Sequence, residues 1–191
     1  LSFSEFEKFD AVILHNYSYH NQGKAFDLLS KFLEKGGKVF IDNGAFSKES
    51  EAEELPEILP FASALRKGLG KEWQMETTPD PILEGVNLEN FGPLDFNGDE
   101  WKISYPTNEL DPDAKAVISH KGKPVLVRQK VKGGELIWSG FNLLYHLNQY
   151  RSDSEARLFT NIVKELVEVK KTDPIAAWAK WISSEKVVLE S

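Results

Sequence analysis

The chain has 191 residues, 41% hydrophobic and 28% charged, a balance that fits one medium-sized globular domain and excludes a disordered or fibrous chain. Its formal net charge of −7, without any cluster of basic residues, argues against nucleic acid as a partner. No stretch reaches the roughly 18 to 20 apolar residues of a membrane-spanning helix, and the first residues lack the basic start and apolar centre of a signal peptide.

The absence of cysteine excludes a disulfide framework, a thiolate nucleophile and a cysteine-bound zinc. Lysine and glutamate dominate the charged residues, and with a single methionine the composition resembles that of thermophile proteins. Because the chain opens on Leu1 and closes on the apolar, strand-like segment 186–189, we expect it to be a piece of a longer polypeptide. Its location stays open between an extracellular domain of a membrane protein and the cytoplasm.

A strand, a helix and a second strand are predicted near the start, after a short helix capped by Ser4. The continuous apolar run 11–14 is typical of a strand covered on both faces, so we expect a central position in the sheet. Apolar residues at helical spacing predict a helix over 24–35, which Gly36–Gly37 ends, and 39–41 forms the next buried strand. This order predicts a βαβ unit with two parallel strands.

The middle of the chain has weaker periodicity. Residues 48–72 predict a loop and a short, irregular helix around residues 61–65. Short extended stretches interrupted by Pro, Gly, Asn and Asp then predict a mainly antiparallel segment, over 73–77, 101–104, 114–119 and 125–131. Gly133 and Gly134 predict a hairpin in which both adopt a positive φ, and we expect the sheet to end there.

The last regular element is a predicted helix over 154–170, with Ser152 and Asp153 as candidate caps. Beyond a Thr-Asp-Pro breaker, Trp178 and Trp181 share one face of a short amphipathic turn that packs either on a neighbouring domain or on this domain's own sheet. We therefore divide the chain into a domain over 1–172 and an appendage, or the start of a following domain, over 173–191.

The order of these segments resembles the class I glutamine amidotransferase-like superfamily, and within it the trehalose-utilisation (ThuA-like) and β-galactosidase trimerisation-domain group. The resemblance covers about residues 5–170 and is carried by EFEKFDAVILHN, GGKVFIDNGAF, TTPDPILEGVN and KPVLVRQKVKGGELIWSGFN, followed by a long closing helix. It implies an α/β fold, a flavodoxin-like three-layer sandwich whose sheet is mostly parallel with an antiparallel hairpin at one edge.

This chain departs from the family pattern in two respects. Family members usually place a strand and a helix ahead of the strand that matches 11–14, so that strand is either missing or supplied by another segment. Where active members carry a cysteine nucleophile this chain reads Asp42-Asn43-Gly44-Ala45, and where their His and Glu follow the late strand it reads Gly140-Phe141-Asn142. Ser47 has no flanking glycine, so a G-x-S-x-G elbow is also missing. The glutaminase chemistry of the family is therefore absent.

Polar residues follow the predicted parallel strands. Ligands of such sheets bind outside the carboxyl ends of the strands, and this rule places segments 15–16, 42–44 and 140–142 on one rim. His15 is a candidate base or metal ligand with Asp42 as its orienting carboxylate, although strand ends also carry such residues simply to turn the chain. The candidate ligand-binding residues are Asn16, Tyr17, Asn43, Gly44 and Asn142.

Other motifs have ordinary structural readings beside their functional ones. Tyr17 and Tyr19 would form an aromatic shelf for a sugar or merely cover a loop. The acidic run over 49–54 is interpreted as a solvated face, because it lacks the spacing of a calcium loop. No histidine pair has metal-ligand spacing, and His146 is interpreted as a partly buried structural histidine. We predict no metal and no cofactor.

Two functions remain open. The first is a non-catalytic, amidotransferase-like binding or assembly module of a larger protein, with a protein partner or neighbouring domain and a possible sugar ligand. By analogy, the larger protein would be carbohydrate-active or membrane-anchored. The alternative is a hydrolase or carbohydrate-modifying enzyme with a replaced active site at the rim, using His15 and Asp42.

Overall fold

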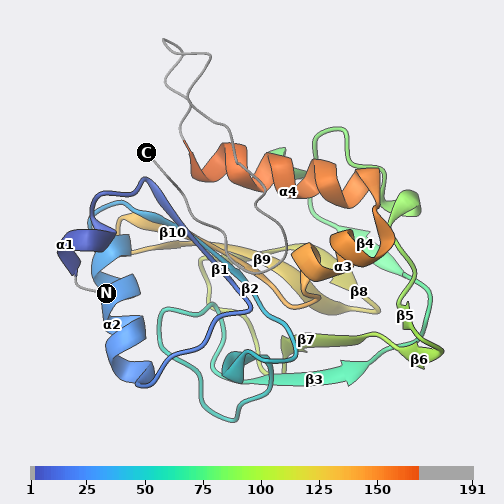
Figure 1. Cartoon of the computed structure of the whole chain (residues 1–191), viewed down its shortest axis with the longest axis horizontal. Coiled ribbons are helices and arrows are strands. Elements are labelled where there is room, and N and C mark those ends of the chain that lie inside the picture. The colour runs from blue at the N-terminus through green and yellow to red at the C-terminus, as the bar shows by residue number, and fades with distance from the viewer. Residues whose placement is uncertain (1–2, 168–191) are drawn as a thin grey trace.

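A six-stranded sheet forms the centre of the molecule in the computed structural model, which describes residues 3–167 (Figure 1). The strands lie in the order β1, β2, β10, β9, β8, β4. Their bounds, in that order, are Ala11–His15, Lys38–Asp42, Gly134–Ser139, Lys123–Val131, Ala114–His120 and Met75–Thr77.

The expected flavodoxin-like sandwich with a mostly parallel sheet is wrong. β2 is parallel to both β1 and β10, but the pairs β10–β9, β9–β8 and β8–β4 are antiparallel. Tight turns join β8 to β9 and β9 to β10, and such turns connect only antiparallel neighbours. The fold is therefore mixed α/β with a mainly antiparallel, strand-rich sheet and few helices.

The predicted βαβ unit is confirmed, but its place in the sheet is not. β1 and β2 are parallel and in register, and α2 (Gln22–Glu34) connects them. The side chain of Asn21 caps α2 by accepting a hydrogen bond from the Lys24 backbone N–H at 2.9 Å. The expectation of a central first strand is wrong, because β1 is the terminal strand of the sheet. A continuous apolar run therefore does not by itself show whether a strand is central or terminal in its sheet.

The β9–β10 hairpin is confirmed, with two corrections. Lys132, rather than either glycine, has the positive φ of the turn, at 61°. Gly134 instead allows a close approach of two backbone segments, since a Cβ there would lie 2.1 Å from the backbone oxygen of Gly37. The sheet also does not end in this hairpin, because β10 pairs with β2 on one side and β9 with β8 on the other.

The predicted irregular helix around residues 61–65 is wrong. Residues Ala64–Gly68 form β3, which pairs antiparallel with β7 (Lys102–Pro106) in a separate two-stranded sheet. This long-range pairing overrides the short helical spacing of Phe61, Ala64 and Leu65. The remaining short elements are β5 (Asp95–Phe96), β6 (Asp99–Glu100), and the 3-10 helices Lys48–Ser50, Pro81–Leu83 and Leu88–Asn90.

The other helices are α1 (Phe3–Phe6), α3 (Leu143–Tyr150) and α4 (Asp153–Leu166). The Ser152 hydroxyl oxygen caps α4 by accepting from the Glu155 backbone N–H at 3.2 Å, which confirms one of the two predicted caps. The calls on Trp178 and Trp181 and on the appendage over 173–191 lie outside the described residues. No helix in the described range is long and apolar enough to cross a bilayer.

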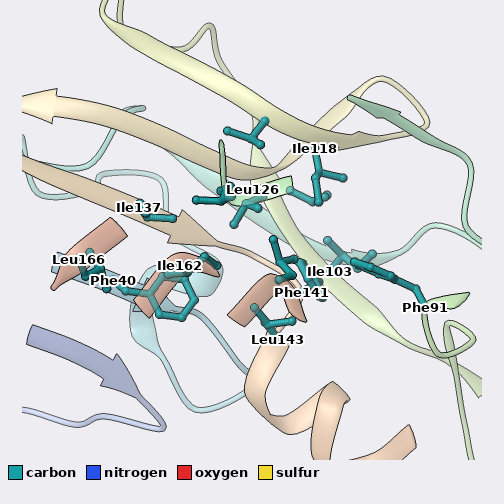
Figure 2. Packing of buried hydrophobic residues seen from close by; sticks show 14 of the residues in the cluster. Phe40, Phe91, Ile103, Ile118, Leu126, Ile137, Phe141, Leu143, Ile162 and Leu166 are labelled. Carbon is teal, nitrogen blue, oxygen red and sulfur yellow. The ribbon is translucent and has the colours of Figure 1, made fainter. Parts of the chain in front are cut away.

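Two apolar layers cover the two faces of the sheet. Side chains alternate along each strand, so Phe40 and Ile137 face the α4 layer while their neighbours face the α2 layer. Figure 2 shows the first layer, in which Phe40 meets Ile162 and Leu166 of α4, with Phe141 and Leu143 following β10. Complete burial of each such side chain contributes about 1.5 to 3 kcal/mol to folding.

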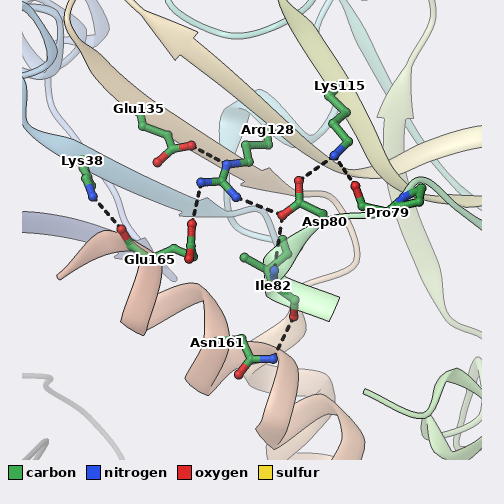
Figure 3. A network of polar contacts seen from close by, with 9 residues as sticks. All are labelled: Lys38, Pro79, Asp80, Ile82, Lys115, Arg128, Glu135, Asn161 and Glu165. Atoms are coloured by element: carbon green, nitrogen blue, oxygen red, sulfur yellow. Dashed lines mark hydrogen bonds and ion pairs between the residues drawn. The ribbon is translucent and has the colours of Figure 1, made fainter. Parts of the chain in front are cut away.

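A partly buried ion network connects α4 and the 79–82 segment to β9 (Figure 3). Arg128 of β9 donates to Asp80 at 2.9 Å, to Glu165 of α4 at 2.7 Å and to Glu135 of β10. Lys115 of β8 donates to the other oxygen of Asp80 at 2.8 Å. One guanidinium thus contacts the 79–82 segment and α4, which are far from it in sequence, as well as the neighbouring strand β10.

The carboxyl group of Asp80 titrates below its usual range. Burial alone would raise its pKa, but hydrogen bonds from Lys115 and the Ile82 backbone N–H, together with the Arg128 charge, lower it. Because the pKa is lower in the folded state, the ionised carboxylate stabilises the fold above the usual aspartate range. That contribution is lost as the pH falls through the folded-state pKa.

The pH dependence of stability tests this network. We expect the free energy of unfolding of the wild type to fall more steeply than that of Asp80→Asn as the pH is lowered from about 5 to 2. The exposed Asp113→Asn is the control and should follow the wild-type slope. Urea unfolding followed by circular dichroism at each pH measures the effect. Parallel curves for wild type and Asp80→Asn would contradict the assignment.

Candidate functional site

The carboxyl ends of three strands meet at one rim of the sheet. The register places His15 at the end of β1 opposite Asp42 at the end of β2, and Ser139 at the end of β10 opposite the same Asp42. The rule for parallel strands therefore located the rim correctly, even though only these three strands of the sheet are parallel.

Asp42 is the buried centre of this rim. Its Oδ2 lies 3.0 Å from His15 Nδ1, so the two predicted residues do meet. The same carboxylate accepts from the backbone N–H groups of Leu143 at 2.7 Å and Leu144 at 2.9 Å. These are first-turn donors of α3, which otherwise lack intrahelical partners. Asp42 therefore caps α3 with a side chain from another element, and its negative charge interacts favourably with the positive end of the helix dipole.

The hydrogen bonds of His15 define its tautomer. Nδ1 faces a carboxylate and therefore carries the proton, while Nε2 accepts from the Asn16 side-chain amide at 3.0 Å. Asn16 occupies the left-handed region, with φ at 47°. The His15 side chain is 22% exposed, whereas Asp42 is fully buried. The imidazole is thus held on both nitrogens at the surface end of the network.

Tyr17 connects the loop after β1 to the loop after β2. Its hydroxyl lies 2.8 Å from Glu49 Oε2 and 3.0 Å from Asn43 Oδ1. The Tyr19 hydroxyl and the Gln22 amide both donate to Glu49 Oε1, the latter at 3.0 Å. Burial, and then the neighbouring Glu49 carboxylate, raise the pKa values of both tyrosines, so their hydroxyls stay protonated donors. The hydroxyls of the two tyrosines that were predicted to form a shelf for a sugar are therefore already hydrogen-bonded within the protein.

Glu49 is a residue that sequence reasoning placed wrongly. The acidic run was expected to be solvated, and Glu51, Glu53 and Glu54 are exposed, but Glu49 is completely buried. Three neutral donors replace the water that this carboxylate loses. Only the distant pairing of the 16–22 loop with the 47–50 turn distinguishes Glu49 from its neighbours, and the local sequence carries no sign of it.

Three buried polar atoms at the rim have no hydrogen-bond partner among the described residues: Asn43 Nδ2, Ser139 Oγ and Asn142 Oδ1. They comprise a donor, a hydroxyl that both donates and accepts, and an acceptor. Gly44 leaves room for the Asn142 amide, since a Cβ there would lie 2.7 Å from Asn142 Nδ2. Buried polar atoms normally find a protein or water partner, so an ordered water or a ligand is expected to complete the hydrogen bonds of these three groups.

An exposed aromatic ring follows Asn43 by three residues in the sequence. A turn closed by the Ser47 backbone N–H on the Gly44 carbonyl, at 3.2 Å, carries Phe46 with 82% of its surface exposed. The Ser47 hydroxyl oxygen also accepts from the Gly44 backbone N–H at 3.4 Å, so Ser47 has a turn-forming role. Phe46 and Ser139 were not predicted, because neither an exposed ring nor an unpaired hydroxyl shows in the sequence pattern.

The other candidates of the sequence lie elsewhere. Within the described residues, no group of three or more His, Asp or Glu side chains is arranged to hold a metal ion. His146 of α3 is completely buried, deeper than expected, with Nδ1 2.8 Å from Glu155 of α4 and Nε2 3.2 Å from the Pro93 carbonyl. It ties α3 to α4 within an aromatic cluster that includes Trp101, and its structural interpretation is supported.

Comparison with known families gives a match over most of the chain. The model of the family DUF8560, described as a domain of unknown function, matches residues 1–146. The chain therefore belongs to that family. No curated protein matches the sequence.

Solved structures share the fold at low sequence identity. The cytoplasmic protein STM1381 from Salmonella typhimurium LT2 superposes with a TM-score of 0.62 at 14% identity, over 86% of this chain and 75% of that one. The cytoplasmic protein STM3548 from Salmonella typhimurium gives 0.54 at 14% identity, over 86% and 74%. The mmIFT52 N-terminal domain gives 0.54 at 14% identity, over 87% and 80%. These matches establish a shared fold only.

Substitutions at the centre of the rim separate capping from exposed contacts. Asp42→Ala removes the acceptor of two α3 backbone donors and of His15, and we expect it to lower the free energy of unfolding by about 2 to 4 kcal/mol. His15→Ala, at the surface end, should cost less than about 1 kcal/mol. Chemical denaturation of both variants measures the difference. Equal losses would show that Asp42 does not act mainly as a helix cap.

Proposed function

We propose that this member of the DUF8560 family is a non-catalytic binding module of a larger protein, with its ligand site at the rim where β1, β2 and β10 end. The observation that carries the proposal is the set of unpartnered atoms on Asn43, Ser139 and Asn142 within the described residues. A ligand that supplies hydrogen bonds to them would remove the desolvation cost of leaving them unpaired. The proposed ligand is neutral and rich in hydroxyl groups, as a sugar is.

The chemistry of the unpartnered atoms favours hydroxyl groups over charged ones. An amide donor, an amide acceptor and a hydroxyl match groups that both donate and accept. The two carboxylates near the rim, Asp42 and Glu49, are already held by protein donors. A cationic ligand would have to compete with those donors, whereas a sugar hydroxyl can accept from Asn43 and donate to Asn142.

The exposed Phe46 ring supports the same ligand class. Sugars present C–H faces that pack on aromatic rings while their hydroxyls bind polar groups. Phe46 belongs to the turn that begins at Gly44, and Gly44 packs directly against the Asn142 side chain. An exposed apolar ring and the unpaired amide of Asn43 therefore occur on the same short segment.

The hydrogen bonds of His15 and Asp42 support a non-catalytic role. Asp42 caps α3, and both ring nitrogens of His15 have partners in the protein. The chain has no cysteine, and within the described residues no serine or threonine hydroxyl is bonded to His15. Nucleophilic catalysis requires such a pairing of nucleophile and base.

A panel of neutral mono- and disaccharides tests the binding proposal. We expect at least one to raise the melting temperature of the chain, since a ligand that binds only the folded state stabilises it. Asn43→Asp removes the amide donor at nearly constant volume and should weaken binding about tenfold or more. Isothermal titration calorimetry measures the affinity.

The matched control is Asn148→Asp on the exposed surface of α3, which makes the same chemical change away from the rim. It should bind the sugar as the wild type does. The proposal fails if no sugar in the panel binds, or if Asn43→Asp and Asn148→Asp bind equally well.

A second candidate function is a hydrolase or carbohydrate-modifying enzyme in which His15 acts as a base. The 3.0 Å contact between His15 Nδ1 and Asp42 is the arrangement that orients a catalytic imidazole, and it leaves Nε2 on the partly exposed side. Turnover of an ester or glycoside would then require Nε2 to exchange its Asn16 contact for the substrate or a water molecule.

His15→Gln separates this candidate from the binding module. If the rim is catalytic, hydrolysis of nitrophenyl esters or glycosides should fall by about 100-fold or more in His15→Gln, because general-base catalysis contributes on that scale. Sugar affinity should stay close to that of the wild type. Absence of turnover in the wild type, with sugar binding retained, would leave only the binding module.

A further inference from the structure

The outer edge of β1 is the larger of the two open ends of the sheet within the described range. β1 has five residues, whereas β4, at the opposite end, has three. A terminal strand presents a row of backbone N–H and C=O groups to which another strand can pair. We propose that this edge binds the β1 strand of a second copy of the chain. The surface is distinct from the ligand site of the rim.

The side chains of β1 are less covered than those of the strand beside it. Val12 and Leu14 pack on the α2 layer and Ile13 on the α4 layer, yet all three stay only partly buried. The matching positions of β2, at 39–41, are completely buried. The difference is the cover that a further neighbouring strand supplies, so apolar surface remains available on both faces of β1.

The strand carries none of the features that usually protect an edge. Ala-Val-Ile-Leu-His contains no proline, glycine, lysine or acidic residue. Phe9, two residues before the strand, adds a ring that is 44% exposed. An exposed, apolar and regular edge of this kind favours strand addition.

The sequence of β1 is complementary to itself in the antiparallel direction. Rotation about Ile13 places Ile13 opposite its own copy and Val12 opposite Leu14, so the side chains of each pair lie on the same face of the sheet. Ala11 then lies opposite His15, and no charged residue of the strand meets a like charge. Such a pairing is a closed twofold contact that joins two six-stranded sheets.

Pairing ends with the strand at His15, because Asn16 is in the left-handed region at φ 47° and the Tyr17 hydroxyl is bound to Asn43 and Glu49 within its own chain. The exposed ring of Phe9 lies near the other end of the strand, two residues before Ala11. A second copy therefore satisfies the hydrogen-bonding edge and the half-covered side chains in one arrangement.

The size of the contact sets the expected affinity. Stable interfaces bury about 1,200 to 2,000 Å², and pairing of two five-residue strands covers less than that. The dimer is accordingly expected to be weak, so that it forms only at high protein concentration.

Sedimentation equilibrium of the 191-residue chain up to about 1 mM measures this dimer. Ile13→Lys places two ammonium groups opposite each other at the twofold axis and should raise the dissociation constant about tenfold or more. Met75→Lys is the matched control, since Met75 lies in the other terminal strand and is a partly buried neighbour of the same apolar layer. It should change the constant less than about twofold.

Hydrogen exchange at the β1 amides gives a second readout, with protection expected to increase with protein concentration. If Ile13→Lys does not fold, Phe9→Lys, at an exposed position, takes its place and should also weaken the dimer. The proposal is overturned if the wild type stays monomeric at about 1 mM, or if the β1 variant dimerises as Met75→Lys does. Protection of β1 that does not change with concentration would overturn it too.

Discussion

The buried carboxylate of Asp42 is the constraint on which the rim depends. One side chain at the end of β2 binds His15 at the end of β1 and the first two backbone N–H groups of α3. Because these groups come from three separate parts of the chain, Asp42 links the first βαβ unit to the helix that follows β10. A carboxylate in a buried position is tolerated only when such donors replace its water. His15 therefore shares with the start of α3 the carboxylate that it contacts.

Two polar networks connect strands of the sheet to helices at different places in the fold. The rim network around Asp42 joins β1, β2 and α3, while the Arg128 network joins β9, β10, α4 and the 79–82 segment. Arg128 is suited to its place because a guanidinium presents its donors in several directions at once. Between the two networks the core is apolar, with Phe40 and Ile137 completely covered. The unpartnered atoms Asn43 Nδ2 and Asn142 Oδ1 lie next to Asp42 and at the start of α3, which are parts of the rim network.

The sequence predicted the parts of the fold that local pattern determines. The βαβ unit and the Ser152 cap were predictable, because helical spacing, glycine stops and capping residues act within a few positions. The parallel sheet, the central place of β1 and the helix near residue 61 were not, since each depends on which strand pairs with which over long distances. At the site, the meeting of His15 with Asp42 followed from the strand ends, whereas the burial of Glu49 followed only from a contact between two loops.

The edge of β1 and the rim have one property in common. At both, groups of the chain lack a partner among the described residues: half-covered apolar side chains on β1, and unpaired polar atoms on Asn43, Ser139 and Asn142. A folded chain accepts exposed apolar surface readily, but unpaired buried polar atoms carry a desolvation cost. The unpaired rim atoms are thus the basis for proposing a small ligand there, and the open edge of β1 is the basis for proposing that a second copy of the chain pairs with it.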